Sequence, residues 1–434
     1  MEIMYGPCQE NIMINIEKNF DNVMSLNISM WPELCVEDIN RISIIEDLLN
    51  IATEDSEVDP AAILFTFLSG FGAMVGSDPH IKIGDTCHPA RINAVLVGAS
   101  SRARKGTSEK PVRRILKCAE EYAEIQPLNI SPGPLSSSEG LIYAVRDANE
   151  SGKELDLGVQ DKRLWCIEQE FASVFKAGKR DGNTLSCTIR TAWDGGTISP
   201  LTKHNKICAT DPHISILGHI TQEELRFVLN STEIWNGFAN RFLWVCVQRK
   251  KLVPLPRPID DVVMQAMGME LGKILLSARS LSELRLTPSA TEFWKEEYPT
   301  LTTDFPGKYG VITSRAEAYT LRLALACALI DGAVSIDLHH LRAAIAMWWY
   351  CNDSAKFLFG NMDSDSDSDK ILIALDEGPM TTTELHGLFS GHKNGRELDT
   401  MLSKLQMEGK IIGKQPYTSH KRGKPTTIWS SITR

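Results

Sequence analysis

The sequence lacks any apolar run long enough to cross a bilayer, a span that needs about 18 uninterrupted apolar residues. Its first residues, MEIMYGPCQENIMINIEKNF, also lack the charged and apolar regions of a signal peptide. These two absences predict a cytoplasmic protein with no membrane partner.

The ten cysteines include no CxxC pair, so the sequence encodes neither a zinc ribbon nor a ladder of disulfides. We expect reduced thiols in the core and no metal cluster, because even His80, Cys87 and His88 fit no common ligand spacing. With 434 residues, 43% of them hydrophobic and 23% charged, the composition excludes a disordered protein. This length predicts roughly two to four domains.

Charge is spread unevenly along the chain. The formal net charge is −9, but residues 370–434 hold 10 Lys and Arg against 6 Asp and Glu, a net +4 that leaves −13 for the rest. Just before that stretch, the run DSDSDSD at 363–369 cannot bury apolar surface and should stay solvated. The sequence therefore predicts an acidic body, an acidic linker and a basic C-terminal module.

Apolar runs and helical patterns alternate before the linker. Strands are predicted at RINAVLVG, RLWCIEQEF, HISILGHI and RFLWVCVQ. Helices are predicted over 43–75, with a start at Asp59-Pro60, over about 107–125, and after Thr221, whereas the polar stretch from Phe171 to Lys206 resembles a hairpin. Continuous apolar strands separated by helices indicate an α/β fold whose parallel sheet is covered on both faces.

A candidate phosphate loop follows the first of these strands. The chain reads Gly98-Ala-Ser-Ser-Arg-Ala and then Arg104, Lys105, Gly106, Thr107 and Ser108 before it enters a helix. Small residues between a strand and a helix N-terminus let backbone N–H groups converge on an anion. Lys105 can bind phosphate, and the hydroxyl of Thr107 or Ser108 can bind Mg²⁺. The alternative is a basic surface loop.

Two acids end the second apolar strand. An ATPase needs one carboxylate to hold Mg²⁺ and another to polarise the attacking water, and Glu168 and Glu170 alternate along an extended chain and so can point the same way. Acids also end many strands without any such role. The pairing with the preceding loop favours the catalytic interpretation.

Two more residues are catalytic candidates. His219, on the third strand, is placed to sense a γ-phosphate or to bond the attacking water, or else is an interior imidazole. Arg241 stands just before the fourth strand, where a guanidinium can act as an arginine finger toward a neighbouring subunit or form a structural ion pair.

Several of these segments together resemble an uncharacterised P-loop family of mobile-element and primase-associated bacterial proteins. The resemblance spans roughly Ser43 to Phe359 and is carried by LVGASSRARKGTS, LSSSEGLIYAVRD, DKRLWCIEQEFASVFKAGKRDGNTLSCTIRTAWDGG, LTKHNKICATDPHISILGHIT and NGFANRFLWVCV. Some members carry a primase-polymerase domain, which implies a primase or replication partner. Priming activity is not implied, because too few residues precede the loop.

A more distant similarity links the order of motifs to AAA+ replicative helicases of the minichromosome-maintenance and superfamily-three kind. It implies ATP and Mg²⁺ as cofactors, Lys105 on phosphate, Thr107 and Glu168 on the metal, and Glu170 beside them. It further implies His219 as first sensor, Arg241 as finger and Arg315, in TSRAEAYTLRLA, as second sensor in a helical lid. A finger acting in trans implies a homo-oligomer, and the expected assembly is a hexameric ring.

DNA contacts are expected at two places. Lys203, His204 and Lys206 fall where such helicases carry a DNA-tracking hairpin, although such a charge cluster is often a solvated turn. After the linker, three helical patterns and two apolar runs predict a winged helix, which binds DNA or a protein. Its expected DNA-binding residues are Asn394, Arg396 and Lys404 on the third helix and Lys421, Arg422 and Lys424 in the wing.

These inferences combine into one predicted architecture. It has an N-terminal helical region (1–90), an AAA+-like P-loop ATPase core in three layers (91–253), a helical lid (254–362), the acidic linker (363–369) and a winged-helix domain (370–434). The expected function is DNA unwinding or remodelling in the replication of a mobile element. Two alternatives are an ATP- and DNA-binding defence or regulatory switch that does not translocate, and a non-enzymatic DNA-binding regulator.

Overall fold

The chain divides into two compact units, with the boundary between Leu358 and Phe359, close to the predicted acidic linker. The computed structural model describes residues 31–432 except 100–102, 132, 150–155, 181, 201–206, 230–232, 235, 361–367, 369–370, 373, 376–377, 390–393, 408 and 415–426. Most of the linker therefore lies outside the described residues. No helix in the described ranges is long and apolar enough to cross a membrane.

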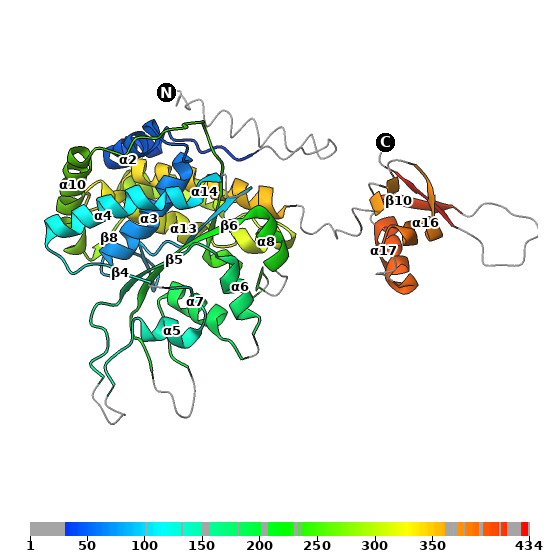
Figure 1. The fold of residues 1–434 in the computed structure, drawn as a ribbon, viewed down its shortest axis with the longest axis horizontal. Coiled ribbons are helices and arrows are strands. Elements are labelled where there is room, and N and C mark those ends of the chain that lie inside the picture. The colour runs from blue at the N-terminus through cyan, green and yellow to red at the C-terminus, as the bar shows by residue number, and fades with distance from the viewer. Residues whose placement is uncertain are drawn as a thin grey trace, which may run out of the picture. The chain divides into compact units, whose positions relative to one another are not determined.

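A five-stranded, all-parallel sheet forms the centre of the first unit (Figure 1). The strand order is β4-β5-β6-β3-β7. The strands span Ala94–Gly98 (β3), Asn129–Ile130 (β4), Arg163–Glu168 (β5), His213–Thr221 (β6) and Leu243–Val247 (β7). The central strands are almost wholly buried, which explains why they appear in the sequence as continuous apolar runs. The predicted parallel α/β architecture is confirmed.

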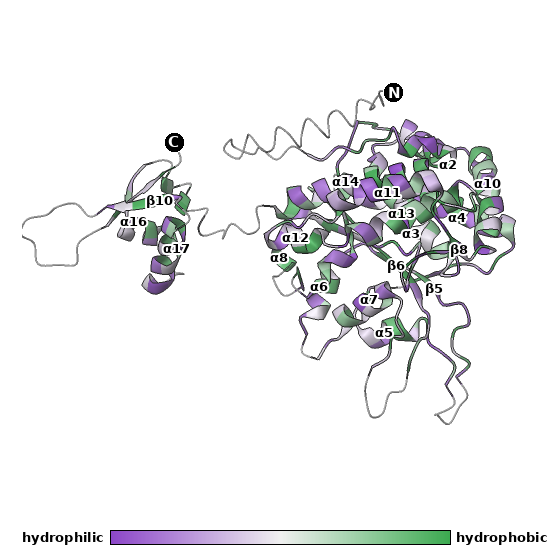
Figure 2. Ribbon diagram, turned by 180° about the vertical axis from the view of Figure 1, so that it is seen from behind, coloured by the Kyte–Doolittle hydropathy of each residue, from purple (hydrophilic) through white to green (hydrophobic). Residues whose placement is uncertain are grey.

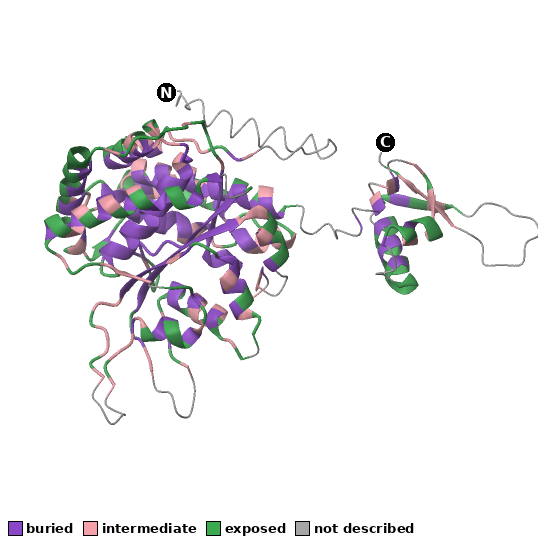
Figure 3. Cartoon of the chain, in the orientation of Figure 1, coloured by how far each residue is buried: buried purple, intermediate pink, exposed green. Residues whose placement is uncertain are grey.

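One group of helices shares a single hydrophobic core with one face of the sheet. It contains α2 (Ser43–Glu54), α3 (Pro60–Val75), α4 (Glu109–Ala123), α10 (Asp261–Arg279), α13 (Ala316–Ile330) and α14 (Leu338–Phe359). Helices at the periphery of this layer mix hydrophilic and hydrophobic residues (Figure 2), and their buried residues face inward (Figure 3). Gly268 of α10 permits close packing on α4, because a Cβ there would lie 2.2 Å from the Cβ of Cys118.

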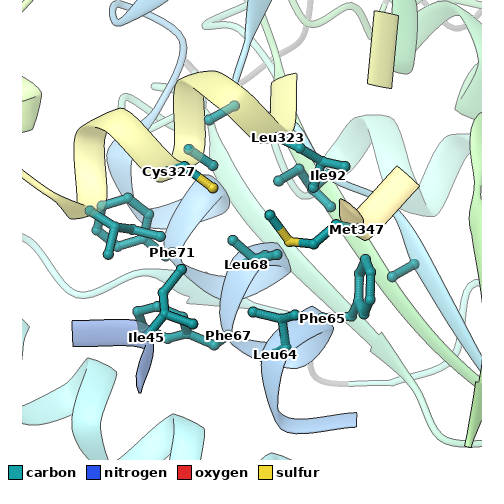
Figure 4. Close-up of a cluster of buried hydrophobic side chains, with 14 of the residues drawn as sticks. Ile45, Leu64, Phe65, Phe67, Leu68, Phe71, Ile92, Leu323, Cys327 and Met347 are labelled. Atoms are coloured by element: carbon teal, nitrogen blue, oxygen red, sulfur yellow. The ribbon is translucent and has the colours of Figure 1, made fainter. Parts of the chain in front are cut away.

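Helix α3 is the centre of this layer, and nearly all of its residues are buried. It begins where predicted, since the Asp59 side chain accepts the N–H of Ala61 and proline occupies the first turn. Figure 4 shows its apolar side chains meeting Ile45 of α2 on one side and Leu323 and Cys327 of α13 on the other. The N-terminal helices are therefore part of the same core as the sheet.

Shorter helices cover the other face: α5 (Ser138–Tyr143), α6 (Ala172–Gly178), α7 (Leu185–Asp194) and α8 (Gln222–Val228). The hairpin predicted for this stretch is wrong over 172–194, where α6 and α7 form instead. Aromatic packing explains the difference, because Phe175 of α6 lies edge-on against both Phe171 and Phe238. The contact with Phe238 comes from a distant part of the chain and leaves no local periodic signal.

The rest of the first unit adds a small sheet that was not predicted, and two helices within the stretch 254–362 that was predicted to be helical. Strands β1 (His80–Ile83) and β2 (Thr86–Pro89) pair antiparallel, and β8 (Glu283–Leu284) pairs parallel with β1. Two further helices are α11 (Pro288–Leu301) and α12 (Gly307–Thr313). Short 3₁₀ turns occur at Ile39–Arg41 (η1), Lys105–Thr107 (η3) and Ala239–Arg241 (η4).

The second unit has its own small core of leucine, isoleucine, methionine and phenylalanine side chains. Its elements are β9 (Met380–Thr381), α16 (Thr382–Gly387), α17 (Gly395–Met407), β10 (Ile411–Lys414) and β11 (Ile428–Ser431). The strands form an antiparallel sheet in the order β10-β11-β9. The two predicted C-terminal strands are thus confirmed as β10 and β11, and β9 adds a third.

Candidate functional site

The carboxyl-terminal edge of the parallel sheet collects the predicted loop and acids. Gly98 ends β3 and lies opposite Thr221, the last residue of β6, while Glu168 ends β5 opposite Gly218. Strand β6 separates β3 from β5, so the loop and the acid leave strands about 10 Å apart. The edge outside the carboxyl ends of parallel strands is where open α/β sheets bind ligands.

Lys105 lies over the end of β3. A Cβ on Gly98 would lie 3.3 Å from Lys105 Nζ and 2.4 Å from the Cβ of Ala103, so only glycine permits the loop to fold back this closely. The Lys105 side chain is mostly buried, and this burial lowers its pKa, against the opposing effect of Glu224 and Glu170 nearby. A partly desolvated ammonium at a strand-to-helix turn suits a phosphate ligand.

Through its side chain, Arg104 is bonded to an acid outside the loop. It has a left-handed backbone, with φ at 55°, and its Nε donates to Glu57 Oε2 at 2.8 Å. Glu57 also accepts the N–H of Val253, and these two bonds lower the pKa of its carboxyl. Arg104 therefore ties the loop to the turn before α3, and a phosphate contact would require it to exchange this partner.

The two candidate hydroxyl groups have different surroundings. Ser108 is fully buried, donates to the carbonyl of Lys105 at 2.7 Å, and lies 3.2 Å from the hydroxyl of Thr66. Thr107 and Gly106 are exposed at the start of α4. Thr107 is therefore the hydroxyl that is accessible to a metal ion, and Ser108 holds the loop against α3.

Glu168 and Glu170 do not share a face. Strand β5 ends at Glu168, and the next two residues form a turn, so the extended geometry assumed for this pair is wrong. Glu168 is 2% exposed, and burial raises its pKa to about 7, although its Oε1 accepts the Leu135 N–H at 2.6 Å. Glu170 is exposed, and its charge acts on Lys105. One acid is thus buried and the other solvated.

His219 is buried within β6, and no described group bonds its Nε2. Burial lowers the pKa of His219 to about 4, with a smaller lowering by Lys105 and an opposing effect of Glu109. The imidazole is therefore neutral at pH 7. A buried polar nitrogen without a partner, next to Lys105, is the kind of group that a ligand or an ordered water satisfies.

Sequence reasoning missed two acids at this edge. Glu109, in the first turn of α4, is buried and accepts from Gln169 Nε2 at 3.1 Å and from Arg113 at 2.9 Å. Glu224 forms a capping box with Thr221 at the start of α8. The T-x-x-E pattern at 221–224 could have revealed the second acid, whereas Glu109 carries no local signal.

Arg241 lies at the opposite edge of the sheet. It immediately precedes β7, whose first residue pairs with Ala94 and whose last pairs with Gly98. Its buried guanidinium donates to Asp194 at 3.0 Å, to the carbonyl of Gly237 at 2.8 Å and to Asn240 at 2.9 Å. Within one chain Arg241 is therefore in a structural ion pair and not beside Lys105.

Arg315 lies with Arg241. Its guanidinium carbon is 4.8 Å from the Trp193 ring centroid, and its Nη1 is 3.7 Å from Asp194. Two buried arginines that the sequence did not single out, Arg91 and Arg322, both donate to the carbonyl of Trp193, each at 3.0 Å. We call Arg91, Arg241, Arg315 and Arg322 the arginine cluster. It does not bring the expected second sensor to the loop within one chain.

The expected DNA-binding residues are partly described. Lys203, His204, Lys206, Lys421, Arg422 and Lys424 lie outside the described residues. Asn394 caps α17, accepting from the Glu397 N–H at 3.0 Å while Glu397 accepts from the Asn394 N–H at 2.9 Å. Arg396 and Lys404 are exposed on α17, opposite its buried leucines.

One set of possible metal ligands occurs in the described part of the chain: Asp331, His339 and His340. His340 Nδ1 accepts the N–H of Asp337 at 2.9 Å, so the ring proton is on Nε2, which donates to Asp331. A metal on Nε2 would require the opposite tautomer. These residues therefore form a hydrogen-bonded helix start, not a cation site.

The chain matches no family model and no curated protein. What can be said about its chemistry therefore rests on the carboxyl-terminal edge of the sheet described above.

Proposed function

We propose that the protein is a Mg²⁺-dependent ATPase of the P-loop class that acts on DNA. The observation that carries this proposal is the position of Lys105 Nζ, which lies against Gly98 at the carboxyl end of β3 on the same sheet edge as buried Glu168. A lysine, a hydroxyl and a carboxylate at this edge are the groups that phosphoryl transfer requires.

Each residue has a distinct role in this proposal. Lys105 binds the β- and γ-phosphates, and Thr107 and Glu168 hold the metal, whose charge offsets that of the phosphates. Glu168 is near half protonation at neutral pH, so binding a cation would release its proton. Glu170, solvated and close to Lys105, orients the attacking water, and the neutral His219 presents Nε2 to the phosphate or to that water.

The finer architecture is also part of the proposal. We assign the helices α10 to α14 as a lid on an AAA+-like core, and the second unit as a winged helix with α17 as its recognition helix. Support comes from the helix and strand order of that unit and from the exposed Arg396 and Lys404 on one face of α17. A primase or another replication protein is the expected partner.

A ring with Arg241 as a finger in trans requires that this arginine leave Asp194. The release of a buried, threefold-bonded guanidinium is costly. This observation favours the second candidate function, a switch that binds ATP and DNA and turns over slowly or not at all. The two functions share the same nucleotide site and differ in hydrolysis.

Steady-state ATP hydrolysis, measured with and without single-stranded DNA, tests the proposal. Turnover stimulated by DNA supports the helicase or remodeller, and tight ATP binding without turnover supports the switch. No ATP binding by the full chain would leave only a non-enzymatic DNA-binding regulator. Lys110→Ala, an exposed lysine on α4, is the matched control for Lys105→Ala.

A further inference from the structure

A cavity of about 440 Å³ lies beside the acid-bearing strand, away from the loop. Its floor includes Leu164 and Cys166 of β5, which alternate with Trp165 and so share one face of the sheet with Glu168. The opposite wall is the end of α5. This volume and its largely apolar lining suit a planar group the size of a nucleobase.

At the rim of the cavity, the side chains of Tyr143 and Arg146 stack on each other. The Tyr143 side chain is 53% exposed, and the guanidinium carbon of Arg146 lies 3.8 Å from the centroid of its ring. Asp156 holds Arg146 in place with two hydrogen bonds of 2.6 and 2.8 Å. Unpaired bases stack on aromatic rings and on guanidinium planes of this kind. Asn129 adds an amide to the wall.

The cavity is connected to Glu168 through one residue. Leu135 lines it, and the backbone N–H of Leu135 donates to Glu168 Oε1 at 2.6 Å. This is the one hydrogen bond to the Glu168 carboxylate among the described residues. A group entering the cavity acts on the loop that holds this acid.

The exposure of Tyr143 favours a base that belongs to a nucleic-acid strand. Because the ring lies at the rim and is open to solvent, a base can stack on it while the rest of its strand stays outside the cavity. Asp147, the neighbour of Arg146, donates its N–H to the Cys208 carbonyl and accepts the Thr210 N–H, so Cys208 and Thr210 lie next to the rim. In the sequence, the basic residues Lys203, His204 and Lys206, which lie outside the described residues, come just before Cys208.

We propose that this cavity binds an unpaired nucleobase of single-stranded nucleic acid, stacked on Tyr143, and that Leu135 transmits its occupancy to Glu168. The proposal deepens the proposed function and rests on it for the role of Glu168. Tyr143 is a binding residue, and Leu135 is a positioning residue.

The test uses the full chain and a fluorescently labelled oligo-dT strand, with a duplex of the same length for comparison. Tyr143→Ala should weaken single-strand affinity about tenfold, as expected for one lost stacking contact. It should also abolish the stimulation of ATP hydrolysis by DNA. Tyr143→Phe should behave as wild type, since it keeps the ring. Tyr298→Ala, at another exposed tyrosine, on α11, should have no effect.

The outcomes separate the two proposals. Unchanged single-strand affinity in Tyr143→Ala overturns the base site, and so does an equal loss of single-strand and duplex binding. A loss of ATP affinity alone would assign the cavity to the base of the nucleotide and overturn the strand assignment. If wild type hydrolyses no ATP but its strand affinity still depends on Tyr143, the base site stands and the proposed hydrolysis fails.

Discussion

The two edges of the parallel sheet differ in how the buried ionisable side chains are hydrogen-bonded. At the carboxyl-terminal edge, Glu168 accepts one described hydrogen bond, and His219 Nε2 has no described partner. Burial raises the pKa of Glu168 and lowers the pKa of His219, so it favours the neutral form of both groups. At the amino-terminal edge, Arg91 and Arg322 each make two bonds to backbone carbonyls. In each of these guanidinium groups, Nε is the one nitrogen without a described partner.

This difference distinguishes a candidate ligand-binding site from a cluster with a structural role. Buried polar groups are normally satisfied, so a cluster that is bonded through most of its nitrogens indicates a structural role, and a buried imidazole nitrogen with no described partner indicates room for a ligand. The arginine cluster joins α7, α13 and the residues before β6 and β7 around Trp193, whereas His219 Nε2 at the other edge has no described partner. Substitutions at the two edges should therefore change different quantities.

The largest expected effect is at Lys105. Lys105→Ala should lower ATP turnover about 1000-fold or more, roughly 4 kcal/mol of transition-state stabilisation, because the phosphates lose their cation. Urea denaturation should show an unchanged free energy of unfolding. Retained ATP affinity and turnover would remove the loop from the site, and Lys110→Ala should match wild type in both measurements.

At the other edge, Arg322→Ala should lower the free energy of unfolding by about 3 kcal/mol, because it leaves the carbonyls of Arg91 and Trp193 without these donors. Arg322 is buried, and its guanidinium carbon lies 3.7 Å from the Trp193 ring centroid. Chemical denaturation measures the effect. Arg180→Ala, at an exposed arginine, should change stability by less than about 0.5 kcal/mol. Equal effects of the two would contradict the bracing role.

The contribution of Glu168 to the free energy of unfolding should depend on pH. Its folded pKa of about 7 lies above the ordinary 4.5, so the folded protein keeps a proton that the unfolded chain releases. Stability should therefore fall as pH rises from about 4.5 to about 7. Glu168→Gln removes this loss, and the variant should be more stable than wild type at pH 8 but not at pH 4.

Urea midpoints at the two pH values test this, with Glu170→Gln as the solvated control. A stability difference between Glu168→Gln and wild type that is the same at both pH values would show that folding does not raise the pKa of Glu168. Nucleotide binding adds a second readout, since Glu168→Gln should weaken the Mg²⁺-dependent part of ATP affinity.

The smallest effect separates the two hydroxyl residues of the loop. Ser108→Ala should cost about 1 kcal/mol of unfolding free energy, because the buried hydroxyl of Thr66 loses its neighbour. Thr107→Ala should leave stability unchanged and weaken Mg²⁺-dependent ATP binding. Thermal denaturation and nucleotide titration distinguish these results, and a reversed pattern would make Ser108 the metal ligand.

Much of the central sheet follows from local pattern. The runs at Ala94–Gly98 and His213–Thr221 are apolar because both faces of their strands are covered, and covered strands without alternation are typical of parallel sheets. The start of α3 could also be predicted from the sequence, since Asp59 and Pro60 are residue types that suit a helix N-terminus. Lys105 could be singled out as a candidate because small residues between a strand and a helix N-terminus allow a loop to bind an anion.

The sequence by itself determined which residues are available at each strand end: Gly98, Lys105, Glu168 and His219. Only the tertiary structure decided their environments, because burial and edge position depend on how distant strands are ordered. Strand order places Arg241 and Arg315 at the amino-terminal edge with Asp194, and the end of β5 separates buried Glu168 from solvated Glu170. Desolvation and partner geometry act through space, so no local spacing of residues encodes them.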